Sequence, residues 1–318
     1  MRHLVIGGNG FIGANLTRLL TGQGEMVRVY HRPASSLAYL QDAAYQFVAG
    51  ELDDAATLSQ AIAASDVVYN LAGCLSTLKK DHAQRSAINV QAAARIARLC
   101  HRSGVRLVHV SSIAAVGSPP AGVVADEEMV FNRHHDPYAL TKWQGEQAVL
   151  AEARQGLEVI VACPGNVVGG LGMKSVQKNN FLAIRAGKMK FYPPGGVCLT
   201  DIDDLVRGLY GCATKGRSGC RYILGGHNIS FRDYFNEIAL ATGGVAPWMP
   251  LPGKLLPFMG WGVEMVFALL ERDPPVNRDT GDVVSRKMYY SSQRAIDELD
   301  YTIGDWQEAV RKAARMIE

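Results

Sequence analysis

The clearest indication of the fold lies in LVIGGNGFIG, residues 4–13. Gly7, Gly10 and Gly13 follow one another at intervals of three, directly after a short apolar run and at the start of a segment with helical spacing. Such glycines let a strand–helix turn approach a pyrophosphate closely, and the helix N-terminus offers free N–H groups and a favourable dipole. A tight turn without a ligand can have the same residues, but a position this close to the N-terminus favours a dinucleotide site.

Apolar runs and helix-like segments alternate through the first half of the chain. The runs predicted as strands are 3–7, 26–31, 45–50, 66–73, 105–112 and 157–165. The segments with helical spacing are 11–24, 53–65, 81–104 and 137–156, and three of these four end on glycine. Strict alternation implies right-handed crossovers, so the sequence predicts an α/β protein with a doubly wound parallel sheet.

Beyond Pro164 the alternation fades, and glycine and proline become frequent. We therefore expect a dinucleotide-binding domain at 1–165. Residues 166–318 are expected to form mainly a smaller α+β substrate-binding lobe, with some segments returning to the first domain. The apolar stretch 248–270 either lines a substrate pocket or forms a lobe core or dimer surface, and the residues favour neither.

Composition excludes several classes of protein. The apolar fraction of 48% and charged fraction of 20% are ordinary for a globular protein, and a net charge of +3 is too small to indicate nucleic acid or an anionic membrane as partner. The six cysteines are scattered, which is typical of reduced thiols, and no residue spacing indicates a metal site. Without a signal peptide or a run long enough to span a bilayer, the chain is expected to be cytoplasmic with no membrane span.

The end of the second predicted strand distinguishes between two cofactors. An acidic residue there would hold the ribose of NAD, whereas arginine accommodates the 2′-phosphate of NADP. The strand ends in VYHRPASS, where Arg32 offers a planar fork for phosphate and no carboxylate is present. The sequence therefore favours NADP(H) over NAD(H).

Another informative stretch is HDPYALTK, residues 135–142. Asp136 is expected to cap a helix whose first residue is Pro137. Tyr138 and Lys142 then lie one turn apart on one helix face. Taken alone, the pair is as readily an aromatic ring packed against a lysine stem as a catalytic couple.

Together these motifs resemble the extended short-chain dehydrogenase/reductases of the NAD-dependent epimerase/dehydratase superfamily. The motifs that occur in that family's order are the glycine turn, NLAG (70–73), VSSIAAVG (110–117), PYALTK (137–142) and PGNVVGG (164–170). The late segments 221–230 and 286–301 are similar to the branch of dihydroflavonol reductase-like and hopanoid-associated epimerase-like proteins, which borders the 3β-hydroxysteroid dehydrogenases. The resemblance implies a Rossmann-type fold.

The resemblance also implies site residues. Its catalytic set falls on Ser112, Tyr138 and Lys142. The cofactor-binding positions are Gly7, Gly10, Phe11, Ile12, Gly13, Arg32, Glu51, Leu52, Leu71, Ala72, Gly73, Tyr138, Lys142, Pro164 and Val167. Glu51 replaces the family's usual aspartate and can still accept from the adenine amino group. Ala114 replaces a frequent threonine and Asp201 a usual histidine toward the substrate side, which argues against borrowing a relative's substrate. Asn89 either bridges near the cofactor or is a satisfied core amide.

The expected activity is reduction of a ketone, or the reverse oxidation of a secondary alcohol, on a small apolar or aromatic molecule. Tyr138 would donate the proton, Ser112 would stabilise charge on the oxygen, and Lys142 would orient the ribose and lower the pKa of Tyr138. Two alternatives are a nucleotide-sugar epimerase or dehydratase that retains NAD(P), and a non-catalytic NADP-binding regulator. Relatives pair through helices like 81–103 and 137–155, so a homodimer is also expected.

Overall fold

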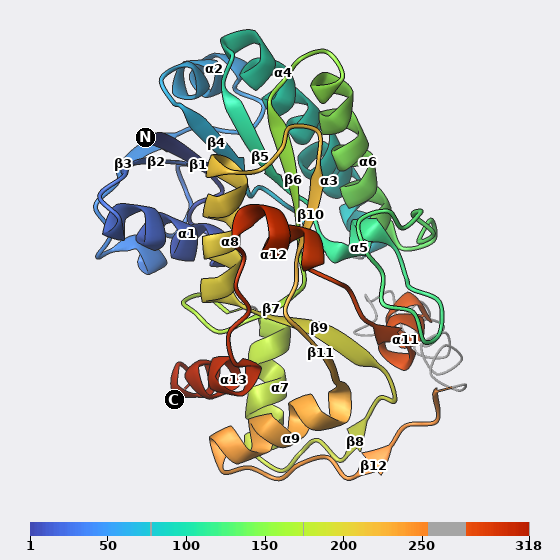
Figure 1. Cartoon of the computed structure of the whole chain (residues 1–318). Coiled ribbons are helices and arrows are strands. Elements are labelled where there is room, and N and C mark those ends of the chain that lie inside the picture. Colours follow the sequence, from blue (N-terminus) through green and yellow to red (C-terminus); the bar gives the residue numbers. More distant parts are fainter. Residues whose placement is uncertain (77, 174, 254–277, 318) are drawn as a thin grey trace.

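A computed structural model describes residues 1–76, 78–173, 175–253 and 278–317. Its main element is a seven-stranded parallel sheet in the order β10-β6-β5-β4-β1-β2-β3 (Figure 1). The strands are β1 (Arg2–Ile6), β2 (Met26–His31), β3 (Gln46–Ala49), β4 (Val67–Asn70), β5 (Arg106–Val110), β6 (Val159–Pro164) and β10 (Arg221–Leu224). All six strands predicted from the sequence belong to this sheet, so the doubly wound Rossmann-type fold is confirmed.

Helices cover both faces of the sheet (Figure 1). One face carries α1 (Phe11–Gly22) and α8 (Ile202–Thr214), and the other carries α2 (Ala55–Ala63), α4 (Ala93–Ser103) and α6 (Pro137–Ala153). Side chains of β1 alternate between the two cores, since Val5 packs with the first set and Leu4 and Ile6 with the second. This period of two, buried on both sides, explains why Leu4, Val5 and Ile6 are all apolar.

The second half of the chain contributes to this sheet as well. Strand β10 forms its edge beside β6, and α12 (Gln293–Leu299) packs against β10 and α8. The boundary at 165 between two separate domains stays a prediction.

A smaller sheet is centred on β9 (Gly196–Asp201). It pairs with β11 (His227–Ser230) antiparallel, and with β7 (Asn166–Val168) and β13 (Lys287–Met288) in parallel. Around it pack α7 (Ser175–Arg185), α9 (Phe231–Thr242) and α13 (Trp306–Arg315). The remaining elements are η1 (Ala38–Leu40), η2 (Lys79–Asp81), α5 (Ile113–Val116), the strand pair β8 (Phe191–Tyr192) and β12 (Met249–Pro250), and α11 (Arg278–Ser285).

The helix expected at 81–104 contains a wider turn. It runs as α3 (His82–Ser86), a π-helical segment η3 (Ala87–Ala92) and then α4. The π segment lies tight against α6, because a Cβ on Gly145 would come 2.0 Å from the carbonyl oxygen of Asn89. Such π turns recur at functional sites, and this one faces a cavity.

Most of the apolar stretch 248–270 lies outside the described residues, which resume at 278. In its described part Trp248 is 66% exposed. No helix within the described ranges is both long and apolar enough to cross a membrane.

Candidate functional site

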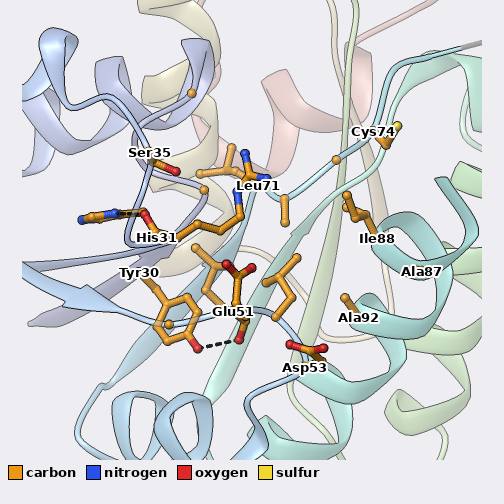
Figure 2. Close-up of a pocket in the computed structure, with 18 of the residues that line it drawn as sticks. Tyr30, His31, Ser35, Glu51, Asp53, Leu71, Cys74, Ala87, Ile88 and Ala92 are labelled. Carbon is orange, nitrogen blue, oxygen red and sulfur yellow. Dashed lines mark hydrogen bonds between the residues drawn. The ribbon is translucent and has the colours of Figure 1, made fainter. Parts of the chain in front are cut away.

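A cavity of about 780 Å³ opens where β1, β2, β3 and β4 end, and we call it the first cavity. Its walls come from the turn after each of these strands and from the helix face at 84–95 (Figure 2). In the strand order this is where the connections change side, the usual place for a ligand in a doubly wound sheet. Its volume falls within the range of cofactor pockets.

The glycine turn has two glycines that the fold itself requires. Gly7 has a φ of +78°, and a Cβ there would lie 3.1 Å from the nitrogen of Ala72. A Cβ on Gly13 would lie 2.4 Å from the carbonyl oxygen of Gly7. A Cβ on Gly10, by contrast, would have a single neighbour within 4 Å among the described atoms, namely the carbonyl oxygen of Gly7 at 3.3 Å. Gly10 lines the first cavity, so its missing side chain leaves room for a ligand.

The N-terminus of α1 is suited to an anion. Its N-cap, Gly10, makes no side-chain hydrogen bond, and its first turn contains no acidic residue. The N–H groups of that turn therefore keep both their hydrogen-bonding capacity and the positive end of the helix dipole. This is the arrangement that a pyrophosphate requires.

Arg32 lies exposed on the wall of the first cavity, together with Ser35. Its backbone oxygen accepts from the nitrogen of Ser35 at 3.0 Å. Its guanidinium has no hydrogen bond or ion pair with any residue that the structure describes. The group is thus available to an oxyanion that enters the cavity.

Opposite this arginine, Glu51 and Leu52 also line the first cavity. Figure 2 shows the Tyr30 hydroxyl donating to the backbone oxygen of Glu51, at 2.8 Å, which leaves the exposed Glu51 carboxylate uninvolved. Arg95, which the sequence analysis did not single out, donates to the carbonyl of Leu52 at 2.7 Å and lines the same wall. The spacing of four, three and four residues from Gln84 to Ile88, Gln91 and Arg95 would have identified this helix face.

A second cavity, of about 480 Å³, adjoins the first. The two cavities are lined by neighbouring residues of the chain: Gly10 and Cys74 line the first, and the next residues, Phe11 and Leu75, line the second. Most of its walls are apolar: Phe11, Ile12, Leu75, Ile113, Ala114, Pro164, Val167, Val176, Val197, Leu199, Phe231, Val283, Val284 and Met288. Its polar side chains are Ser111, Ser112, Arg133, Tyr138, Asn166, Gln177, Asn180, Tyr234 and Tyr290.

Tyr138 is positioned by the cap of α6. Asp136 caps this helix, because its Oδ1 accepts from the nitrogens of Tyr138 at 2.9 Å and Ala139 at 3.0 Å, and Pro137 is the first helical residue, both as predicted. Ser112, which follows β5, lines the same cavity as Tyr138 and accepts from the nitrogen of Ala114 at 3.1 Å, and it lowers the pKa of Tyr138. The structure thus brings the serine and tyrosine together in the second cavity.

The face of α6 that carries Tyr138 also contacts the end of β5 through two further side chains. One turn on, Lys142 is buried and donates from Nζ to the carbonyl oxygen of Val110 at 2.7 Å. A further turn on, Glu146 accepts from the Ser111 hydroxyl at 2.9 Å and from Nε of Arg221 at 2.7 Å. Lys142 and Glu146, one turn apart, therefore bind Val110 and Ser111 at the end of β5, and the sequence analysis did not single out Glu146.

Opposing effects act on the pKa of Tyr138. Burial of the phenol raises its pKa above the ordinary value, because desolvation disfavours phenolate, whereas Ser112 and the charge of Arg133 lower it. The prediction that Lys142, with an oxidised nicotinamide, lowers this pKa stays a prediction.

Asn89 is a buried amide whose oxygen and nitrogen both have partners within the protein. Its Oδ1 accepts from the nitrogen of Cys74 at 2.8 Å, while its Nδ2 donates to the carbonyl of Cys74 at 2.9 Å and to the Thr141 hydroxyl at 3.1 Å. The amide thereby ties the segment that separates the two cavities to α6.

The remaining positions fall as follows. Leu71, Ala72 and Gly73 line the first cavity, and Pro164 and Val167 the second. Asp201 caps α8 through the nitrogen of Asp203, at 3.1 Å. Within the described ranges, no three His, Cys, Asp or Glu side chains gather where they could hold a metal.

Comparison with known proteins agrees with this geometry. The family model described as "NAD dependent epimerase/dehydratase family" matches residues 3–225. A Synechocystis sp. protein named "Putative dihydroflavonol 4-reductase" is 30% identical over 99% of this chain and 94% of its own. The "Sterol demethylase protein B" of Methylococcus capsulatus is 30% identical over 80% of this chain and 79% of its own.

Among solved structures, that of gox2253 superposes with a TM-score of 0.87 at 27% identity and covers 98% of this chain and 96% of its own. Its similarity extends over both sheets. Because the family model spans the glycine turn, the Ser112 and Tyr138 positions and β10, the chain belongs to the NAD-dependent epimerase/dehydratase family, within the extended short-chain dehydrogenase/reductases that bind a nicotinamide dinucleotide.

Proposed function

We propose that the protein is an NADP(H)-dependent oxidoreductase that interconverts a ketone and a secondary alcohol on a small, mainly apolar or aromatic molecule. The observation that carries this proposal is that Ser112 and Tyr138 lie together on the wall of a mainly apolar cavity. That cavity adjoins the one formed by the glycine turn. Two hydroxyls on the same wall can both bind one substrate oxygen.

Each of these side chains has a role in the proposed reaction. Tyr138 donates its proton to the substrate oxygen during reduction and accepts it back during oxidation. Ser112 donates a hydrogen bond to the same oxygen and stabilises the charge that develops on it. NADPH, when bound, supplies the hydride. Lys142 is assigned to the ribose hydroxyls, and its bond to the Val110 carbonyl holds it one turn beyond Tyr138.

The first cavity suits the cofactor, and its residues divide the task. The N-terminus of α1 with Gly10 would hold the pyrophosphate, and Glu51 would accept from the adenine amino group. Leu71–Gly73 would line the cofactor, and Pro164 and Val167 would contact its nicotinamide end in the second cavity. Two features support NADP over NAD: the guanidinium of Arg32, which pairs with no residue that the structure describes, and the absence of a carboxylate from the end of β2, His31.

Substrate class follows from the walls of the second cavity. Aliphatic and aromatic side chains gain free energy when they cover apolar surface, about 25 cal/mol per Å². The names of two relatives, which refer to a dihydroflavonol and a sterol, are consistent with a ring-containing, poorly soluble substrate.

A nucleotide-sugar epimerase or dehydratase is the alternative to this reductase. The apolar walls of the second cavity argue against a diphosphate, and Arg32 against NAD. The intact set of Ser112, Tyr138 and Lys142 argues against a non-catalytic regulator.

Two further proposals concern the protein's state in the cell. Its six cysteines are free thiols, and four of them are buried, which suits a reducing cytoplasm. We also propose a homodimer formed through the α4 and α6 surface, which light scattering in solution would measure.

The test of the proposed function is a panel of aromatic, steroidal and aliphatic ketones and alcohols, assayed by NADPH absorbance with NADH in parallel. Turnover that prefers NADPH would support it. Release of stoichiometric NAD from the denatured purified protein, with epimerisation of a nucleotide sugar, would replace it by the alternative.

A further inference from the structure

One side chain of the second cavity has no part in the proposed reaction. Arg133 is the sole charged residue among the described residues that line this cavity. Its side chain is only 12% exposed, and its neighbours there are mostly aliphatic and aromatic. An arginine in such surroundings is costly unless its donors meet acceptors, so its presence requires an explanation.

The guanidinium is held in a fixed place relative to the reacting groups. One of its nitrogens, Nη2, donates to Oδ2 of Asp136. The other oxygen of Asp136 accepts from the nitrogens of Tyr138 and Ala139 and so caps α6. One carboxylate therefore starts the helix that carries Tyr138 and also orients Arg133. The positive charge of Arg133 interacts with the phenol of Tyr138 and lowers its pKa.

The ion pair with Asp136 uses one nitrogen of the guanidinium. No described residue accepts a hydrogen bond from Nε or Nη1 of Arg133. These atoms are not sealed inside the protein either, in contrast to Nε of Arg85, which is buried without a partner. Arg133 thus presents unused N–H donors in the same cavity as Ser112 and Tyr138.

We propose that Arg133 forms a subsite for a second oxygen of the substrate, a carbonyl or carboxylate a few bonds from the reacting ketone. The substrate is then a dicarbonyl compound or keto acid whose remaining part is apolar. This proposal rests on the proposed function, because it assumes that the reacting oxygen binds at Ser112 and Tyr138. Arginine recognises such oxygens through its planar fork of donors, and charge-assisted hydrogen bonds are about twice as strong as neutral ones.

The alternative is that Arg133 serves only the ion pair at the start of α6. The chain offers a matched control. Arg207 forms an ion pair with Asp204, which also lies three residues away in the sequence, and Arg207 lies on the surface of α8, away from both cavities. Loss of an ion pair alone would affect the variants R133Q and R207Q in the same way.

The experiment measures kcat/KM of the whole protein with NADPH for three ketones of equal chain length: 3-oxononanoate, its methyl ester and nonan-3-one. We expect the wild type to favour at least one of the first two over nonan-3-one by about tenfold or more, the equivalent of one good hydrogen bond. The variant R133Q loses this preference, R133K restores part of it, and R207Q retains it. Preference for the acid alone identifies a carboxylate, and preference for both identifies a carbonyl oxygen.

Equal rates for all three ketones in the wild type, or a preference that survives in R133Q, would overturn the subsite. A failure of the proposed function has a different appearance, because none of the three is then reduced. In that case the same compounds are titrated calorimetrically into wild type and R133Q. Tighter binding of an oxygenated compound that R133Q loses supports the subsite, whereas equal binding, or none, contradicts it.

Discussion

The two cavities meet at the same edge of the sheet but are built differently. The first is formed by the turns that follow four neighbouring strands and by one helix face, all within residues 6–95. The second collects side chains from many segments between Phe11 and Tyr290. The first has polar and apolar lining in similar measure, with several charged side chains, while apolar side chains dominate the second. This contrast suggests that the cofactor site depends on local backbone geometry and the substrate site on packing between distant segments.

We expect the largest effect from replacing Tyr138, which should abolish most turnover in the second cavity and leave cofactor binding in the first unchanged. In Tyr138→Phe the ring still packs but cannot donate a proton, so kcat should fall about 10³-fold, within the range of general acid–base catalysis. The dissociation constant for NADPH, measured by fluorescence titration, should be unchanged. Substantial turnover in this variant would remove Tyr138 from the mechanism.

Arg32 tests whether a single side chain of the first cavity sets the choice of cofactor. Without its guanidinium, Arg32→Ala should bind NADPH about ten- to a hundredfold more weakly, since a hydrogen bond to a charged group contributes about 1.5–3 kcal/mol. Affinity for NADH should stay the same. An equal loss for both cofactors would mean that Arg32 does not contact the 2′-phosphate.

The glycine turn allows fold and ligand to be separated within one motif. In Gly13→Ala the new Cβ would lie 2.4 Å from a backbone oxygen, so the melting temperature should fall, with a cost of about 1–3 kcal/mol. In Gly10→Ala the nearest described atom is 3.3 Å away. That variant should melt like the wild type but bind NADPH about tenfold more weakly, by loss of close approach to the pyrophosphate. A lower melting temperature for Gly10→Ala with an unchanged one for Gly13→Ala would refute our distinction between the two glycines.

The smallest effect is a change in pH dependence. Because burial raises the pKa of Tyr138, its protonated form predominates through neutral pH, and ketone reduction should decline only in the alkaline range. Alcohol oxidation requires phenolate and should therefore rise with pH. Ser112 lowers this pKa, so Ser112→Ala should move the rise in kcat/KM for oxidation to higher pH, besides slowing turnover. A shift to lower pH would contradict the assigned interaction.

Much of the molecule could be predicted because its signals are local. The apolar run of β1, the cap by Asp136 and the spacing of the glycines each depend on neighbours within a few residues, and the structure contains all three. The π segment at 87–92 was not predicted, and it packs against Gly145, more than fifty residues away in the chain. The effect of burial on the pKa of Tyr138 was not foreseen either, because burial is a property of the folded protein.

The amino-acid sequence alone therefore determined the doubly wound sheet, the glycine turn after its first strand and the placement of Tyr138 and Lys142 on one helix face. Only the tertiary structure decided that Glu146 holds Ser111, that Asn89 ties Cys74 to Thr141, and that Arg133 presents unused donors beside Tyr138. These contacts join segments whose mutual positions follow from the packing of helices on the sheet. Packing is a cooperative property of the whole chain, and no short spacing of residues encodes it.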